Sequence, residues 1–234
     1  MPTAGRTIIR NRLLSALPDG ELGRLWPDLH PVNWAVQQTV YEAGDPIEHV
    51  YFVEEGMACI VVIMADGPTS EVGMIGREGI VGASALLGGE AAAQHVIVQI
   101  PGRALRMNAA QCKSAFAQYP AFHEGVLRFV GALLNLSGQV AACNRLHTAR
   151  QRCARWLLMA SDRIGTDMMP MTHEFLASML GVRRTGVTAI ARELQRNGLI
   201  RYRHGQLVIT DRAGLEGAAC ECYRLDREQL RRLG

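Results

Sequence analysis

The chain has 234 residues, of which 48% are hydrophobic and 20% are charged. This balance is typical of a globular protein with a sizeable buried core, and it excludes global disorder. The opening segment MPTAGRTIIRNRLLSALPDGE has scattered arginines without a sustained apolar run, and no stretch reaches the ~18 apolar residues of a membrane helix. We therefore expect a soluble, cytoplasmic protein of one or two domains, without a secretory signal and without a membrane partner.

The net charge is +3, but it is distributed unevenly along the chain. Residues 1–147 contain 10 Lys/Arg and 13 Asp/Glu, whereas residues 148–234 contain 15 Arg, no Lys and 9 Asp/Glu. The first part is therefore mildly acidic and the second clearly basic, which favours a polyanionic partner for the C-terminal part. A solvated basic surface gives the same numbers, so charge alone leaves both interpretations open.

The N-terminal half has the pattern of a β-rich domain. Residues 10–26 predict a short helix with turn signals inside it. From about residue 30 to residue 107, β-rich runs follow one another: VNWAVQQTVY, HVYFVEEGMACIVVIM, SEVGMIG, HVIVQI and RALRM. Turn residues punctuate this region at 44–46, 56, 66–68, 88–89 and 101–102. Many short strands at close spacing predict a β-barrel or β-sandwich.

Two helices are expected next, over residues 109–119 and from Pro120 onward. In the second helix, apolar residues recur in steps of three and four over three heptads, which is the spacing of a coiled-coil seam. The expected seam consists of Val126, Phe129, Leu133, Leu136, Val140, Cys143 and His147. Part of this helix must lie on its own β-domain, but so long a seam favours a homodimer contact.

The segment THEFLASMLGVRRTGVTAIARELQRNGLI has the pattern of two helices joined by a tight turn at Gly181. It follows an amphipathic helix expected over residues 148–164 and a break at 165–170. Thr172 is the expected N-cap of its first helix. The expected buried face of its second helix consists of Val187, Ile190, Ala191 and Leu194. This helix-turn-helix pattern suits insertion of the second helix into a DNA major groove.

Arg183 and Arg184 open the second helix, where the positive end of the helix dipole disfavours cations. At a recognition helix this position is useful, because Arg donates two hydrogen bonds to guanine O6 and N7. The following strand–turn–strand pattern, LIRYRHGQLVITD, predicts a wing whose arginines contact phosphates. The candidate DNA-binding residues are Arg183, Arg184, Thr185, Thr188, Arg192, Arg196, Arg201 and Arg203.

With these motifs, the chain resembles the Crp/Fnr family of bacterial transcription regulators over nearly its whole length. The strongest likeness is the helix-turn-helix segment, and YEAGDPIEHVYFVEEGMACIV is similar to the family's early β-roll. The resemblance implies an α+β fold: an N-terminal β-roll sensor (double-stranded β-helix, jelly-roll-like), a long dimerisation helix and a C-terminal winged helix-turn-helix. The implied domains are residues 1–119, 120–147 and 148–234. It also implies a homodimer on a palindromic operator in double-stranded DNA.

The resemblance further implies an effector pocket, but the phosphate-binding residues differ here. Members that bind cyclic AMP carry a Gly-Glu-Leu-Gly cassette and an Arg-Ser pair, whereas this chain has GIVG at 79–82 and two alanines in place of the pair. A buried phosphate without its arginine is a costly unpaired charge. We therefore expect no dependence on cyclic AMP. The residues of this degenerate pocket are Ile80, Val81, Ala92, Ala93 and His95.

The DNA-reading positions differ as well. Members similar to the cyclic-AMP receptor carry an Arg-Glu-x-x-x-Arg set, and the matching positions here are Arg184, Thr185 and Ala189. A different operator sequence is therefore expected. The resemblance implies RNA polymerase and an unidentified small-molecule effector as further partners.

Six cysteines occur at positions 59, 112, 143, 153, 220 and 222, without a CxxC motif or a zinc-type Cys/His spacing. Free buried thiols and no metal are therefore expected, with a redox role of Cys220 and Cys222 left open. The N-terminal cysteine cluster of the family's iron–sulfur branch is missing. Nothing marks His49, His95 or Cys59 as heme ligands, so no cofactor is expected.

Two other classes of function remain to be weighed. No Ser/His/Asp or Cys/His arrangement and no Gly-rich nucleotide loop is found, so an enzyme is not expected. The alternative is a small-molecule-binding sensor module that acts through a protein partner rather than DNA. Between Arg183 and Arg203 there are six arginines and one acid, whereas protein-contact surfaces are richer in apolar and aromatic residues. This composition favours DNA.

Overall fold

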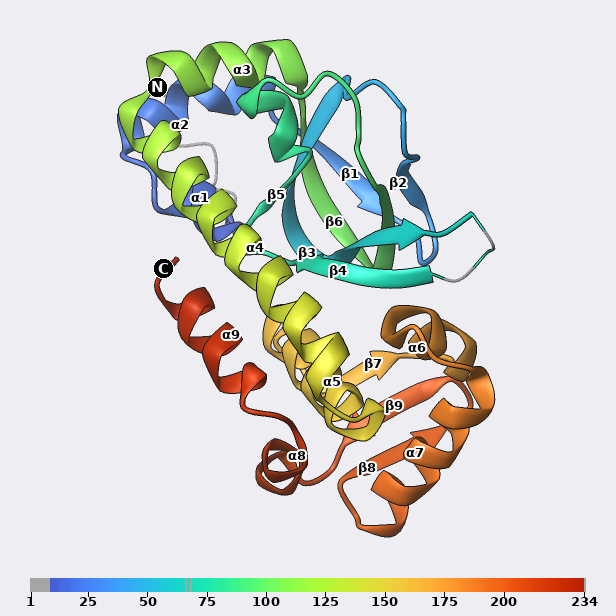
Figure 1. Ribbon diagram of the computed structural model, residues 1–234. Coiled ribbons are helices and arrows are strands. Elements are labelled where there is room, and N and C mark those ends of the chain that lie inside the picture. Colours follow the sequence, from blue (N-terminus) through green and yellow to red (C-terminus); the bar gives the residue numbers. More distant parts are fainter. Residues whose placement is uncertain (1–8, 66, 68, 234) are drawn as a thin grey trace.

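A computed structural model describes residues 9–65, 67 and 69–233 (Figure 1). The residues outside this range include Asp66 and Pro68, so part of one expected turn lies outside the described residues. The N-terminal segment forms two short helices, α1 (Arg12–Ser15) and α2 (Asp19–Leu25), followed by the 3-10 turn η1 (Trp26–Asp28). The single helix expected over residues 10–26 is therefore divided, because Pro18 has no backbone N–H and begins a new helix instead.

Six antiparallel strands then form the expected β-roll. They are β1 (His30–Trp34), β2 (Thr39–Tyr41), β3 (His49–Ile63), β4 (Thr69–Ile75), β5 (Ile80–Val81) and β6 (His95–Asn108), with the 3-10 helix η2 (Ala83–Leu87) before β6. The long strands β3 and β6 pair with each other, and each pairs with two short strands on its other side. The α+β fold class with an N-terminal β-roll is confirmed.

Strand β6 is continuous across Pro101 and Gly102, where the sequence predicts a turn. The register of β3 against β6 shifts at Glu55 and Met57, so this region is a bulge and not a loop. Two glycines make the bulge possible. A Cβ on Gly56 would lie 2.4 Å from the Ile100 carbonyl oxygen, and one on Gly102 would lie 2.1 Å from the Glu55 oxygen. The turn signal therefore marks a bend of two paired strands.

Helices α3 (Ala109–Gln118) and α4 (Pro120–Leu146) follow, with Pro120 in the first turn of α4 as expected. The expected dimer seam is wrong, because α4 uses that face inside its own chain. Five of its residues are at most 7% exposed: Val126, Phe129, Leu136, Val140 and Cys143. Leu133 is partly buried against the same cores, and His147 lies just beyond the helix end. The heptad spacing correctly identified one apolar face of α4, but this face packs within its own chain.

The exposed face of α4 carries a different heptad-spaced set, which we call the outer stripe. It consists of Leu127, Gly131, Leu134, Gly138, Ala141 and Arg145. Leu127 is 45% and Leu134 72% exposed. By length and composition α4 also qualifies as a helix able to cross a membrane, contrary to the sequence expectation, although core helices of soluble proteins pass the same test. Apart from Arg145 at its end, the outer stripe is an exposed apolar surface of the described chain.

The C-terminal part contains α5 (Ala149–Ile164), β7 (Met168–Pro170), α6 (His173–Leu180), α7 (Arg184–Arg196), β8 (Ile200–Arg203), β9 (Gln206–Ile209), α8 (Arg212–Ala218) and α9 (Cys222–Arg231). Thr148 and Gln151 form a capping box at the start of α5. The break expected at residues 165–170 contains β7, which pairs with β9 and extends the wing to three strands. Helix α9 returns to lie along α4 (Figure 1).

The β-roll and the C-terminal part share one hydrophobic core. Met57 and Met74 of the roll lie in the same buried cluster as Trp156 and Leu157 of α5. Buried polar contacts cross the same boundary. The carboxylate of Glu71 on β4 accepts hydrogen bonds from Trp156 Nε1 at 2.6 Å and from Cys59 Sγ at 3.2 Å. The two parts are therefore tightly joined in this conformation.

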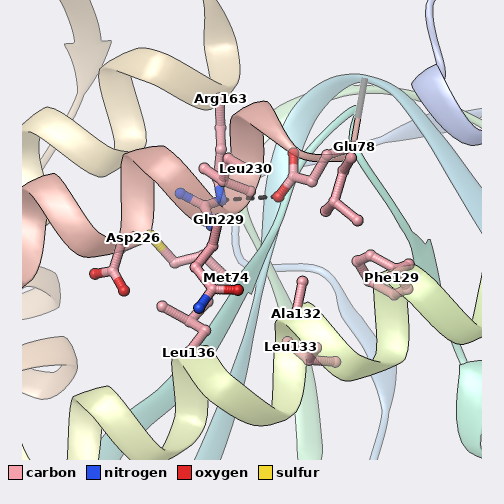
Figure 2. A pocket seen from close by; sticks show the side chains of 11 residues that line it. Met74, Glu78, Phe129, Ala132, Leu133, Leu136, Arg163, Asp226, Gln229 and Leu230 are labelled. Atoms are coloured by element: carbon pink, nitrogen blue, oxygen red, sulfur yellow. Dashed lines mark hydrogen bonds and ion pairs between the residues drawn. The ribbon is translucent and has the colours of Figure 1, made fainter.

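A buried ion pair reinforces this junction. Arg163 Nε of α5 donates to Glu78 Oε1 at 2.9 Å, with the two side chains 1% and 4% exposed. Glu78 also accepts from the Gly76 amide at 3.1 Å, so the turn between β4 and β5 is fixed onto α5. Figure 2 shows the pair beside a small cavity between α4, α9 and β4, with Phe129, Leu133 and Asp226 around it.

The buried carboxyl of Glu71 predicts a pH-dependent stability. Burial raises its pKa from 4.5 to about 7, so the folded state binds more protons than the unfolded state between these values. The free energy of unfolding should therefore fall by about 3 kcal/mol as pH rises through this window, at about 1.4 kcal/mol per pKa unit. Urea denaturation between pH 5 and pH 8 measures it.

Glu71→Gln should flatten that pH profile and raise stability at the alkaline end, because the amide stays neutral at every pH. The exposed Glu90→Gln is the matched control and should keep the wild-type slope. A Glu71→Gln profile that keeps the full slope would show that another group causes it.

Candidate nucleic-acid interface

Helices α6 and α7 form the expected helix-turn-helix. Thr172 caps α6, its hydroxyl oxygen accepting a hydrogen bond from the Phe175 amide at 3.1 Å. Gly181 ends α6 with φ +62°, a left-handed conformation that glycine adopts without strain. The buried side of α7 is formed by Val187, Ala191 and Leu194, with Ile190 half-buried beside them. These four residues match the face predicted from the sequence.

The opposite side of α7 is basic and open to solvent. Arg183 is the N-cap residue rather than the first helical residue, and α7 begins at Arg184. Arg192 and Arg196 follow on the exposed surface, and Thr185 is exposed as well. The Arg183 side chain does not cap the helix, so the first amides of α7 face outward at the positive end of the dipole. Such a helix start is a ready site for a phosphate oxygen.

Thr188 differs from the other candidates, because its hydroxyl is already engaged. It is half-buried and donates to the Arg184 carbonyl oxygen at 3.0 Å. The same hydroxyl lies 3.0 Å from His173 Nδ1 of α6. Thr188 thus joins the two helices, and its side chain is less free to meet a base than Thr185.

Arg184 has one acidic neighbour. Its Nε lies 3.7 Å from a carboxylate oxygen of Glu174, and both side chains are at least 70% exposed. Solvent screens such a pair, and its contribution to stability is small. The guanidinium of Arg184 at the start of α7 therefore remains open to solvent and available to a ligand.

The wing lies beside α7. His204 and Gly205 have φ values of +51° and +76°, as a tight two-residue hairpin turn requires. Arg201 and Arg203 are two residues apart on β8 and both are exposed. Between them, Tyr202 faces the protein, where its hydroxyl donates to the Met171 carbonyl oxygen at 2.9 Å. The candidate arginines of the wing and of α7 thus belong to one small domain (Figure 1).

Several arginines that the sequence did not single out have positioning roles. Arg152 of α5 donates to the Leu180 carbonyl oxygen at 2.8 Å and so supports the end of α6. Arg150 Nε donates to Glu193 at 2.7 Å, so the single acid between Arg183 and Arg203 is paired. Spacing in the sequence gave no sign of either contact, because the partners come from different helices.

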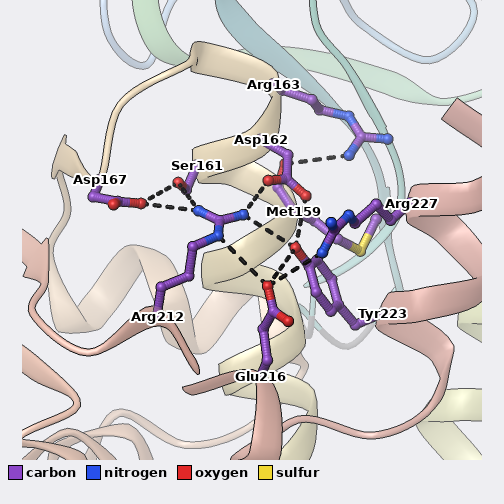
Figure 3. Close-up of polar contacts among 9 residues, drawn as sticks. All are labelled: Met159, Ser161, Asp162, Arg163, Asp167, Arg212, Glu216, Tyr223 and Arg227. Carbon is purple, nitrogen blue, oxygen red and sulfur yellow. Dashed lines mark hydrogen bonds and ion pairs between the residues drawn. The ribbon is translucent and has the colours of Figure 1, made fainter. Parts of the chain in front are cut away.

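Arg212 is half-buried and is engaged by residues of its own chain. Figure 3 shows its guanidinium among Asp162, Asp167, Glu216 and Tyr223. Its distances to Asp167 Oδ1 and to the Tyr223 hydroxyl oxygen are 3.0 Å and 3.1 Å. This network attaches the start of α8 to α5, so part of the positive charge counted in the C-terminal sequence serves the fold.

The β-roll contains a cavity of about 140 Å³ at the expected effector site. Ile80, Val81, Ala92 and Ala93 line it together, as predicted, but His95 does not. The other lining residues are Tyr41, Ile47, Ile60, Ile75, Gly82, Ala83, Ser84, Gln94, Val96 and Leu133. No lysine or arginine is among these described residues, so the walls offer a phosphate no cation. Leu133, expected at a dimer seam, enters the wall of this cavity from α4.

Comparisons with known proteins match both parts of the chain. Residues 31–119 match the family model described as a cyclic nucleotide-binding domain, and residues 151–218 match the Crp-like helix-turn-helix domain. A curated relative is the transcriptional regulator LdrP of Thermus thermophilus. It is 26% identical over 203 residues, covering 80% of this chain and 95% of the relative.

Solved structures share the fold at lower identity. FixK2 from Bradyrhizobium japonicum has a TM-score of 0.71 and 17% identity, with 82% of this chain and 98% of that chain covered. A CRP-family transcriptional regulator from Thermus thermophilus has a TM-score of 0.68 and 22% identity, covering 82% of this chain and 99% of its own. The order of roll, long helix and winged domain is thus shared along almost the entire length of these proteins.

Proposed function

The chain belongs to the Crp/Fnr family of DNA-binding transcription regulators, and from this premise we propose that it binds a palindromic operator as a homodimer, without cyclic AMP. The observation that supports base reading is the start of α7, where exposed Arg183, Arg184 and Thr185 surround uncapped amides. Arg201 and Arg203 of the wing suit the phosphate backbone. The protein acts in the cytoplasm, with RNA polymerase as a further partner and no enzymatic activity of its own.

The proposed dimer forms through the outer stripe of α4. Gly131, Gly138 and Ala141 allow two helices to approach closely, and Leu127 and Leu134 supply apolar area to bury. The spacing of four and three residues keeps the stripe on one side of the helix over its whole length. A two-fold axis along α4 would also place two copies of α7 for a palindrome.

The cavity suits a neutral and largely apolar effector. The alternative is that the protein binds DNA without any effector. The cavity wall contains isoleucine, valine and alanine side chains but no cation for a cyclic phosphate. Leu133 connects this cavity to α4. A molecule in the cavity would therefore press on the same helix that carries the outer stripe, and a shift of α4 would reorient the recognition helices.

The test is selection from a randomised duplex pool, followed by fluorescence anisotropy on the enriched sequence, with and without cyclic AMP. We expect one palindrome to be enriched equally in both conditions. Enrichment that requires cyclic AMP would contradict the interpretation of the cavity. Absence of enrichment, together with binding that depends little on salt, would favour the alternative of a sensor module that acts through a protein partner.

Variants of the selected complex separate base contacts from phosphate contacts. Arg184→Ala should cost about 1–3 kcal/mol and relax the sequence preference at one base pair of each half-site. Arg203→Ala, the matched wing variant, should weaken specific and random DNA alike and reduce the salt dependence. If both variants lose affinity equally on the two kinds of DNA, Arg184 is a phosphate contact only.

A further inference from the structure

Four potential metal ligands meet where the C-terminal end of α4 faces the start of α9. Cys143 and His147 are four residues apart at the end of α4, so they share one side of it. Cys220 and Cys222 flank Glu221 between α8 and α9. The three sulfurs and a ring nitrogen all lie within 4.8 Å of one another, and the three cysteines are buried. The three thiols are free and buried, as the sequence predicts, but the sequence gave no sign that they lie together.

The spacing of these atoms fits one tetrahedral ion. With Zn–S bonds of ~2.3 Å, two sulfurs on a tetrahedral zinc ion are about 3.8 Å apart. The Cys143 and Cys220 sulfurs are 3.6 Å apart, and Cys222 Sγ is 3.6 Å from His147 Nδ1. We propose that Cys143, His147, Cys220 and Cys222 form a Cys3His site for Zn²⁺. Three thiolates and one imidazole are a donor set that selects zinc over hard cations such as Mg²⁺ or Ca²⁺.

The surroundings of the cluster support ligation. His147 turns its other nitrogen, Nε2, to the Glu221 carboxylate at 3.2 Å, an arrangement that fixes the orientation of the ring. Gln139 Nε2 donates to Cys222 Sγ at 2.9 Å, which orients this sulfur within the cluster.

The ion would fasten two segments that are distant in the sequence. The ligands of α4 lie directly before Thr148, where the chain turns into α5, and the other two begin α9. Helix α9 contacts α4 again through Asn135 and Gln229, whose amide nitrogen and oxygen are 3.4 Å apart. Zinc would therefore hold the C-terminal helix along the proposed dimerisation helix, next to the junction with the DNA-binding part. Its binding does not depend on DNA or on an effector.

The experiment uses the full chain, stripped of metal under reducing conditions and titrated with Co²⁺ and then Zn²⁺. We expect one Co²⁺ per chain with the visible absorption bands of tetrahedral thiolate coordination, displaced by an equivalent of Zn²⁺. Zinc should also raise the melting temperature, because an ion that binds only the folded state stabilises it. A wild-type protein that gives no such bands in reducing buffer would overturn the proposal.

Variants identify the ligands. Cys220→Ala and His147→Gln should each weaken zinc binding at least about 100-fold in a chelator competition, and Glu221→Gln about 10–100-fold. Cys112→Ala removes a buried thiol from α3, outside the cluster, and should bind zinc as the wild type does. Circular dichroism identifies variants that remain folded. Wild-type affinity in a folded Cys220→Ala protein would also overturn the assignment.

Discussion

Leu134→Asp is expected to convert the dimer to a monomer and to lower affinity for the selected operator at least about 1000-fold. Leu134 is 72% exposed at the middle of the outer stripe, so the aspartate is harmless in the single chain. In the dimer, two carboxylates would face each other across the two-fold axis without a cation nearby. Desolvation and repulsion then both oppose association. A monomer contacts only one half-site and therefore loses the contacts that the second recognition helix makes.

Analytical ultracentrifugation and anisotropy measure the two effects on the same preparation. Leu87→Asp is the matched control, since Leu87 is 49% exposed at the end of η2 and is not part of the outer stripe. That control should stay dimeric and bind DNA as the wild type does. If the Leu134→Asp protein sediments as a dimer, the outer stripe is not the dimer interface. If the variant is monomeric but binds the full palindrome with wild-type affinity, DNA binding does not require the dimer.

Arg163→Ala should lower the free energy of unfolding by about 3–5 kcal/mol. The guanidinium and the Glu78 carboxylate are removed from water, with 1% and 4% of their side chains exposed. Deleting the arginine leaves Glu78 charged and buried with the Gly76 amide as its remaining partner, 3.1 Å away. Deletion also frees the Met159 carbonyl oxygen, which accepts from Arg163 at 3.2 Å. The variant therefore loses the contact that fixes α5 to the β-roll.

Two further variants test this explanation by urea denaturation. Arg103→Ala breaks a pair with Glu55 at the surface, where the arginine is 56% exposed, and should destabilise the protein far less than Arg163→Ala. The double variant Glu78→Gln, Arg163→Met should recover much of the lost stability, because no isolated charge remains. If Arg163→Ala lowers the free energy of unfolding no more than Arg103→Ala does, the buried ion pair does not stabilise the junction between the β-roll and α5.

Local patterns predicted the winged helix almost residue by residue. The cap at Thr172, the turn at Gly181 and the hairpin at His204 each depend on neighbours in the sequence, so propensity and φ preference suffice. The succession of strands and turns in the β-roll was also predicted from the sequence. The bend at Gly102 was not, because a glycine that permits two strands to approach resembles one that ends a strand.

The errors came from contacts that no local pattern records. The heptad spacing of α4 identified a buried face but not what buries it, and the β-roll, not a second subunit, covers Val126 and Phe129. The lysine-free, arginine-rich composition of the C-terminal part predicts one charged surface. The structure divides it into the exposed Arg184 group, the buried Arg163, and the half-buried Arg212, which is paired with acidic residues of its own chain. The cysteine–histidine cluster joins two sequence-distant pairs and has no recognisable spacing.

The core shared between the β-roll and α5 limits how far the two parts could be exchanged with those of another protein. Here Met57, Met74 and Trp156 lie in one buried cluster, and Glu71 bonds across the same boundary. A winged domain transplanted onto a foreign sensor would expose Trp156 and leave the host with an unmatched surface. A working exchange of either part would therefore require matching substitutions on both sides of the junction.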